Sequence, residues 1–196
     1  LRRDNFQGIV VALTGSSGKT SVKEAIAMIL SQANQVHATS GNLNNHFGVP
    51  LTLLAMDSKT DIAVIEMGAS AIGEIDYLSS IAKPDIALVN NAQSAHIEGF
   101  GSLEAIALAK AEIYKSLKSD GTAVLNLDQP WVEQWLEIIG ERKCISFSMT
   151  EQRADLFAKD VKDMGDGYFS FVLCINPKLA GVSIEQAVRL SHPGIH

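Results

Sequence analysis

The chain has 196 residues, of which 46% are hydrophobic, enough to bury the core of one large domain or of a domain with a small appendage. Its 16 basic and 22 acidic residues give a formal net charge of -6, and no basic run is longer than two residues. We therefore expect neither a nucleic-acid-binding nor a membrane-binding surface. No apolar run approaches the roughly 18 residues that a membrane span needs, and the N-terminus does not resemble a signal peptide.

The two cysteines favour a reducing compartment. Cys144 and Cys174 have no partners at metal-ligand spacing and suit plain core positions, so a cytoplasmic location is predicted. Because the chain starts at Leu1 rather than at a methionine, we expect it to be part of a longer protein.

Apolar runs of strand length alternate with segments of helical periodicity along the first 150 residues. We expect strands at 8–13, 35–39, 61–67, 84–90, 122–126 and 143–147. We expect helices at 19–31, 49–56, 73–82, 103–117 and 131–139. Alternation of this kind predicts an α/β fold, in which a mostly parallel sheet is covered by helices on both faces.

The pattern changes after residue 150. Alternating segments surround the turn 164–167, Met-Gly-Asp-Gly, and predict an antiparallel β-hairpin appendage within 151–196. Residues 182–190 are ambiguous, because Ser183 and Gln186 fit a helix cap whereas the apolar residues mostly keep a period of two. We favour a strand there.

The first predicted strand ends in a glycine-rich turn, GSSGKT at 15–20, directly before a helix. Glycines allow backbone N–H groups to converge on anionic oxygens, and a helix N-terminus favours negative charge. Lys19 would then meet the β- and γ-phosphates of a nucleotide, and the Thr20 hydroxyl would hold Mg²⁺. The alternative is a glycine-rich turn that only caps a helix. The predicted phosphate cradle comprises Thr14, Gly15, Ser16, Ser17, Gly18, Lys19 and Thr20.

The loop has two residues between its glycines instead of the usual four, and this shorter form resembles the phosphate loop of the Mur ligases and folylpolyglutamate synthetases. These are ATP-driven enzymes that join a carboxylate to an amine. Other stretches resemble the Mur ligases that join D-alanyl-D-alanine to UDP-N-acetylmuramoyl-tripeptide. They are GNLNNHFGVPLTLL (41–54), AVIEMGAS (63–70), PDIALVNNAQSAHIEGFGS (84–102) and AKAEIYKSL (109–117). The resemblance covers most of 8–130 and is looser beyond 150.

The resemblance implies the central ATPase domain of such a ligase, with residues 1–150 as the P-loop core and 151–196 as its truncated appendage. The family's N-terminal uridine-binding domain and C-terminal ligase domain would lie outside this chain, so we expect the 196 residues alone to have little or no ligase activity. The implied cofactors are ATP and two Mg²⁺ ions. The implied partners are the two small-molecule substrates, and we expect a monomer.

Two further residues fit metal ligands. Glu66 ends an apolar run at the carboxyl end of a predicted parallel strand, where α/β sheets bind ligands, and can coordinate Mg²⁺ there. The alternative is a strand-end glutamate that faces solvent. His96 lies in the loop after the strand 84–90. By itself it reads as a surface histidine, but the resemblance implies a place beside a second Mg²⁺.

Lys110 falls within the apolar stripe of the helix predicted at 103–117, and a lysine on a buried face must extend to solvent, pair or lose its charge. In the Mur ligases the lysine of this segment reacts with CO₂, and the resulting carbamate supports the second Mg²⁺. Desolvation would supply the neutral amine that this reaction needs. An ion pair with Glu66 or Glu112 is the alternative. The resemblance thus makes Lys19, Lys110 and His96 the predicted catalytic residues.

Asparagines cluster in two loops expected beside the phosphate site. By resemblance, Asn44, Asn45 and Asn91 would contact the muramoyl-tripeptide, although asparagines are also ordinary turn residues. Asn126 and Asp128 end a strand and lie either near the nucleotide or in a plain turn.

Two other functions are alternatives to the ligase. A nucleotide-dependent switch usually carries a guanine-selecting N-K-x-D stretch, and this sequence has none. Another muramoyl-peptide ligase or a folylpolyglutamate synthetase is disfavoured only by the resemblance of NLNN and HIEGFGS.

Overall fold

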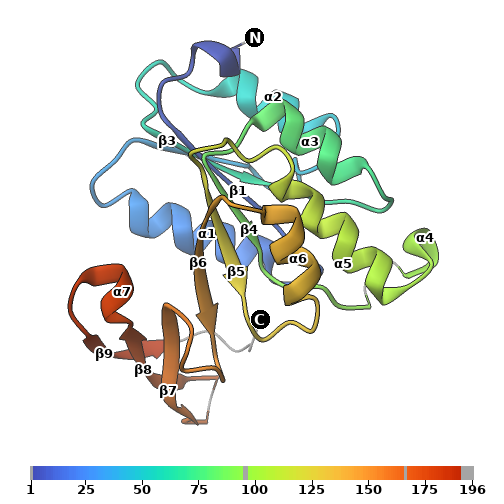
Figure 1. Cartoon of the computed structure of the whole chain (residues 1–196). Helices are drawn as coiled ribbons and strands as arrows, with labels where there is room; N and C mark the ends of the chain where they lie inside the picture. The colour runs from blue at the N-terminus through green and yellow to red at the C-terminus, as the bar shows by residue number, and fades with distance from the viewer. Residues whose placement is uncertain (1, 95–96, 166, 191–196) are drawn as a thin grey trace.

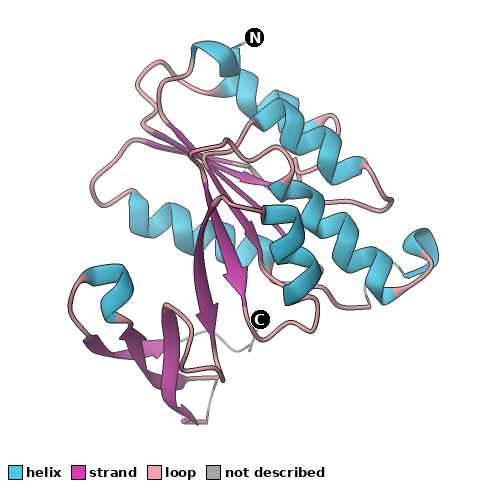
Figure 2. Ribbon diagram, in the orientation of Figure 1, coloured by secondary structure: helices cyan, strands magenta, loops and turns pink. Residues whose placement is uncertain are grey.

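The computed structural model describes residues 2–94, 97–165 and 167–190, and its strands form one nine-stranded sheet with the order β2-β3-β1-β4-β5-β6-β7-β8-β9 (Figures 1 and 2). The strands are β1 (Ile9–Thr14), β2 (Val36–Ala38), β3 (Ile62–Glu66), β4 (Ile86–Val89), β5 (Thr122–Asn126), β6 (Lys143–Ser148), β7 (Leu156–Asp163), β8 (Phe169–Ile175) and β9 (Ile184–Leu190). The helices are η1 (Arg2–Asn5), α1 (Lys19–Leu30), α2 (Gly48–Ala55), α3 (Glu74–Ala82), α4 (Ile97–Phe100), α5 (Leu103–Ala111), η2 (Glu112–Tyr114), α6 (Val132–Ile139) and α7 (Pro177–Ala180).

The sheet is parallel from β2 through β6, which confirms the predicted α/β fold. The C-terminal segment is not a separate sheet. Strand β7 pairs in parallel with the end of β6, through Phe147 with Leu156 and Ser148 with Phe157, and β7, β8 and β9 then continue as antiparallel neighbours. The appendage is therefore a three-stranded extension of the main sheet (Figure 1).

The alternation of side chains along β1 separates two core layers. Val10 and Ala12 pack into the larger cluster, to which α2, α3, α5 and α6 contribute, whereas Val11 and Leu13 face α1. Figure 1 shows the same division, with α1 on one side of the sheet and α3, α5 and α6 on the other.

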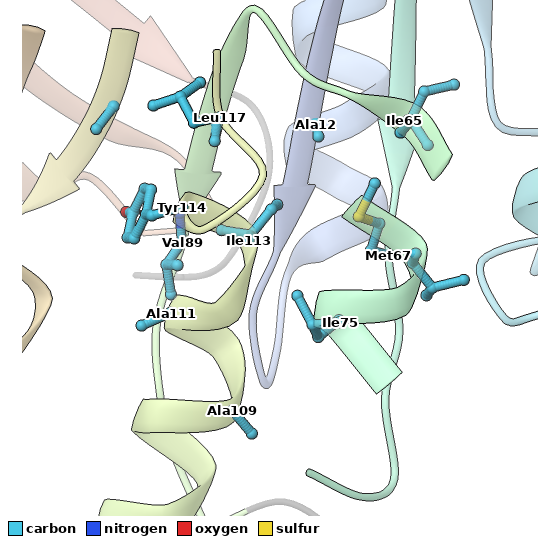
Figure 3. Packing of buried hydrophobic residues seen from close by; sticks show 14 of the residues in the cluster. Ala12, Ile65, Met67, Ile75, Val89, Ala109, Ala111, Ile113, Tyr114 and Leu117 are labelled. Carbon is cyan, nitrogen blue, oxygen red and sulfur yellow. Dashed lines mark hydrogen bonds between the residues drawn. The ribbon is translucent and has the colours of Figure 1, made fainter. Parts of the chain in front are cut away.

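Two aromatic residues of the larger cluster, Tyr114 and Trp135, pair their buried polar atoms with backbone groups. Figure 3 shows Tyr114 beside Val89 and Ala111, and its hydroxyl donates to Val124 O at 2.9 Å and accepts from Val89 N at 3.2 Å. Trp135 is fully buried, and its indole N–H donates to Ala107 O at 3.1 Å. These bonds spare the core the cost of unsatisfied polar groups.

Most predicted elements form within a few residues of their expected ends. The helix predicted at 103–117 is shorter: α5 ends at Ala111, and the 3₁₀ turn η2 then places Ile113 and Tyr114 in the core. The ambiguous segment 182–190 contains strand β9, as favoured. The turn between β7 and β8 also forms, with Tyr168 N donating to Gly165 O, although Asp166 lies outside the described residues.

The four-residue helices α4 and α7 and the turn η1 were not predicted, because one turn is too short to establish a period. None of the described helices combines the length and hydropathy that a bilayer crossing requires.

Candidate functional site

Polar residues gather where neighbouring parallel strands end. In the pairing register Leu13 lies opposite Glu66, and Thr14 lies opposite Val89, which Asn90 follows directly. The loops that leave β1, β3 and β4 therefore start side by side at one edge of the sheet. This edge is where open α/β sheets bind ligands.

The loop after β1 exposes the N-terminus of α1. Gly18 has φ of 72°, a left-handed conformation that glycine adopts without steric cost, and no side chain caps the helix. The first amides of an α-helix have no acceptor inside the helix. Together with the helix dipole, the amides at Lys19 and Thr20 make this end suited to a phosphate group.

Asn91 fixes the part of this loop formed by Ser16 and Ser17. Its side-chain oxygen accepts from the backbone N–H groups of both Ser16 and Ser17 at 3.0 Å, and its amide nitrogen donates to Ser17 O at 3.1 Å. Asn90 adds a second bond to Ser17 O at 3.0 Å. The amide of Asn91, predicted to contact substrate, is thus engaged with the phosphate loop in this structure, and its contact with substrate stays a prediction.

Lys19 faces a cavity of about 740 Å³ beside the loop. Its Nζ donates to Ser16 O at 3.3 Å. Burial lowers the pKa of the Lys19 ammonium, and the nearby Glu66 carboxylate opposes that shift. The cavity is lined by Gly15, Ser16, Lys19, Asn44, Asn45, His46, Gly68, Ala69, Ser70, Ile72, Gly73, Glu74, Tyr77, Leu78 and Lys110.

Glu66 is buried rather than solvent-facing, since only 1% of it is exposed. Its Oε1 accepts from Asn44 Nδ2 at 2.8 Å, whereas its buried Oε2 has no partner among the described residues. A buried carboxylate oxygen without a donor is costly unless it meets a cation. The close approach of Asn44 is possible because Gly68 follows the strand: a Cβ there would lie 3.0 Å from the Asn44 side-chain oxygen.

These residues fit Mg²⁺ bound together with a nucleotide. Within the described part of the chain, no group of three or more His, Cys, Asp or Glu side chains is arranged to hold a metal ion. Magnesium bound to a nucleotide does not need such a group, because phosphate and water oxygens supply most of its ligands. The free Oε2 of Glu66 and the hydroxyl of Thr20, exposed in the first turn of α1, are oxygen ligands of the type that Mg²⁺ prefers.

Lys110 enters the same cavity from α5 and is 4% exposed. Its Nζ lies 5.7 Å from the centre of the Phe100 ring. Burial, with Lys19 nearby, lowers the pKa of Lys110 to about 8, while Glu74 and Glu112 oppose the shift. No ion pair joins Lys110 to Glu66 or Glu112 among the residues that the structure describes.

The remaining predicted residues divide into two groups. Asn44 and Asn45 line the cavity, and Asn45 Oδ1 also accepts from Phe47 N and Gly48 N at the start of α2. His96 lies outside the described residues, so its place beside a second metal ion stays a prediction.

A second cavity, of about 400 Å³, is lined by Asn90, Asn91 and Gln93 from the loop after β4. The apolar part of its lining comes from β6, β7, β8 and β9 and from Met149 just after β6, and it includes Phe147, Phe169 and Phe171. Asn126 and Asp128 also line this cavity. Asp128 lies in a turn too, where its carboxylate accepts from Met149 N at 2.6 Å. The sequence did not identify the phenylalanines as site residues. No local sequence pattern shows that the C-terminal strands lie beside the loop after β4.

The model of the Mur ligase middle domain matches residues 13–189 of the chain. The chain belongs to the Mur ligase family. This Mur ligase middle domain is 50% identical over 159 residues to the UDP-N-acetylmuramoyl-tripeptide--D-alanyl-D-alanine ligase of Escherichia coli (strain K12), a match that covers 81% of the chain and 35% of that protein.

Solved structures agree with the family membership. MurF from Acinetobacter baumannii superposes with a TM-score of 0.90 at 36% identity, covering 98% of the chain and 41% of that structure. The MurF ligase from Thermotoga maritima in complex with ADP gives 0.80 at 34% identity, covering 97% and 42%. A folylpolyglutamate synthetase from L. casei, at 18% identity and a TM-score of 0.61, shares the fold. The chain spans 35% to 42% of the length of the Escherichia coli, Acinetobacter baumannii and Thermotoga maritima ligases.

Proposed function

We propose that this chain is the nucleotide-binding part of an ATP-dependent ligase that joins D-alanyl-D-alanine to UDP-N-acetylmuramoyl-tripeptide in peptidoglycan precursor synthesis in the cytoplasm. The observation that carries the proposal is one cavity in which Lys19 of the phosphate loop and Lys110 meet, beside the buried, half-unpaired carboxylate of Glu66. The two proposed substrates are taken from the names of the relatives, which are UDP-N-acetylmuramoyl-tripeptide--D-alanyl-D-alanine ligases.

In the proposed reaction the terminal carboxylate of the tripeptide attacks the γ-phosphate of ATP, and ADP leaves. The amine of D-alanyl-D-alanine then attacks the acyl phosphate, and phosphate leaves as the amide forms. The N-terminal amides of α1 would bind the phosphates, and Lys19 would neutralise charge that develops on the transferred group. Thr20 and Glu66 would hold Mg²⁺, which supplies further charge neutralisation when bound. His96 is proposed beside a second Mg²⁺.

Lys110 would act as a carbamate in this proposal. A pKa of about 8 leaves on the order of one-tenth of the amine uncharged at pH 7, compared with well under one-thousandth at the ordinary lysine pKa of 10.5. The neutral nitrogen can attack CO₂, forming an N–C bond and releasing a proton to solvent. The product is an anion at the cavity wall, suited to support a metal ion near Lys19.

The second cavity is the proposed site of the adenine base. Its aromatic lining offers flat apolar contact, and the amide of Asn126 offers a polar partner. Asn91 lines this cavity and also accepts a hydrogen bond from Ser17 N in the phosphate loop. A nucleotide would therefore extend from the base in this cavity, past Asn91, to phosphates bound at that loop. We infer that the domains that hold the uridine and select the dipeptide lie outside this chain, and that the chain alone has little or no ligase activity.

Calorimetric titration of the chain with a non-hydrolysable ATP analogue and Mg²⁺ tests the proposal. Lys19→Ala should weaken binding by about tenfold or more, because it removes a charge-assisted contact to phosphate. Lys59→Ala, which removes an exposed lysine far from the loop in sequence, is the control and should bind as the unmodified chain does. Preference for a GTP analogue over the ATP analogue would contradict the ligase and favour a nucleotide-dependent switch.

A further inference from the structure

Lys23 is a fully buried lysine outside the cavity lining. It lies on α1, one helical turn after Lys19, and is 1% exposed. Its Nζ donates to Thr39 O at 2.7 Å and pairs with Glu24 Oε1 at 2.7 Å, although the Glu24 side chain is 68% exposed. Burial of an ammonium group is costly, so the position calls for a physical reason.

The carbonyl that accepts from Lys23 belongs to Thr39, which also forms hydrogen bonds to β3, the strand that ends in Glu66. Thr39, which is 1% exposed, follows β2, and its hydroxyl accepts from Glu66 N at 3.0 Å. Its own N–H donates to Val64 O at 3.0 Å. A short chain of bonds therefore runs from the helix that carries Lys19 and Thr20, through Thr39, to the backbone of Glu66.

We propose that Lys23 is a positioning residue that fixes the Glu66 carboxylate relative to the N-terminus of α1, and so sets the spacing of the two protein ligands offered to Mg²⁺. The inference rests on the proposed function, because it concerns the same ion. It adds a residue that touches neither nucleotide nor metal. Val22 and Ile26 of α1 and Ala38 of β2 pack against one apolar cluster, and apolar burial is not directional. The hydrogen bond from Lys23 is charge-assisted and therefore adds a directional contact.

The test separates metal positioning from a general loss of structure. Affinity for the non-hydrolysable ATP analogue is measured with Mg²⁺ and with EDTA, and the ratio gives the contribution of the ion. Lys23→Met, which keeps the apolar stem, should reduce that ratio by about tenfold, the lower end of the range for residues that orient metal ligands, while metal-free affinity stays within about twofold. Lys23→Arg should restore much of the ratio, and the matched control Lys59→Met, at an exposed position, should leave it unchanged.

Thr39→Val tests the second link in the chain and covers the case in which Lys23→Met does not fold. It removes the hydroxyl that accepts from Glu66 N, keeps the shape of the side chain, and should show the same selective loss of the Mg²⁺ contribution. An unchanged ratio in Thr39→Val, or equal losses with and without Mg²⁺ in both variants, overturns the role of Lys23. If the unmodified chain binds no nucleotide at all, the proposed function falls first and this inference falls with it.

Discussion

Lys110 carries a cost that should be visible in the stability of the chain. Its folded-state pKa of about 8 lies below the ordinary lysine pKa of 10.5, so the folded state binds fewer protons than the unfolded state between these pH values. The penalty is fully present below pH 8 and disappears as the pH rises toward 10.5. It amounts to about 3 kcal/mol, because each unit of pKa corresponds to roughly 1.4 kcal/mol.

Lys110→Met should therefore raise the free energy of unfolding at pH 7, by up to about 3 kcal/mol, with a gain that shrinks above pH 8. Urea unfolding at pH 7 and at pH 10 measures both values. Lys59→Met, at an exposed position, should change neither. A gain that is the same at both pH values would mean that packing, and not the buried charge, sets the effect.

Sequence reasoning found Lys110 and missed Lys23 for a physical reason. The position of Lys110 on an apolar helical stripe is a local pattern, readable without knowing any partner. The burial of Lys23 depends on Thr39, which comes from another element, and so cannot be read from α1 alone. The same holds for Asn91, whose bonds to Ser16 and Ser17 require β1 and β4 to be neighbours.

At the scale of an element, the start of α3 is held by a residue from η2. The buried carboxylate of Glu112 accepts from Gly73 N at 3.0 Å through both oxygens and from Asp76 N at 3.2 Å. It therefore caps α3 from outside the helix, where a negative charge also complements the helix dipole. The loop that it anchors lines the cavity, through Ile72 and Gly73.

Glu112→Ala should destabilise the chain by on the order of 2 kcal/mol, because buried backbone N–H groups lose a charged acceptor. Glu112→Gln, which keeps one oxygen acceptor, should lose less. Urea unfolding measures the change, and Glu137→Ala on the exposed face of α6 should stay within about 0.5 kcal/mol of the unmodified chain. A loss in Glu112→Ala no larger than this control would remove the capping role.

The 3₁₀ turn at η2 explains why the helix predicted at 103–117 ends early. Glu112 turns toward α3, while Ile113 and Tyr114 turn into the core (Figure 3). A continuous α-helix would carry these side chains in directions set by its 3.6-residue period. The local periodicity predicts that a helix forms here. Where the helix ends depends on contacts with residues elsewhere in the chain, which the periodicity does not show.

At the scale of the whole molecule, the order of the strands decides which loops meet. Alternating strands and helices predict a parallel sheet, but not that β1 lies between β3 and β4, nor that β7, β8 and β9 extend the same sheet. That extension brings aromatic residues of β8 to the second cavity, close to Asn91 and Asn126. The proposed site for the base and the proposed site for the phosphates are thus two separate cavities. Asn91 lines the first and bonds to the loop that borders the second.

This arrangement predicts that the base and the phosphates can be tested separately. Phe171→Ala removes an aromatic wall of the second cavity and should weaken ADP binding by about tenfold, because aromatic contact contributes roughly 0.5–1.5 kcal/mol beyond simple burial. Inorganic tripolyphosphate has no base, so its affinity should not change. Tyr168→Ala is the control, since that ring lies 4.9 Å from the Arg189 guanidinium and does not line the cavity. Equal losses for ADP and tripolyphosphate would indicate a disturbed phosphate loop, and no loss for ADP would place the base elsewhere.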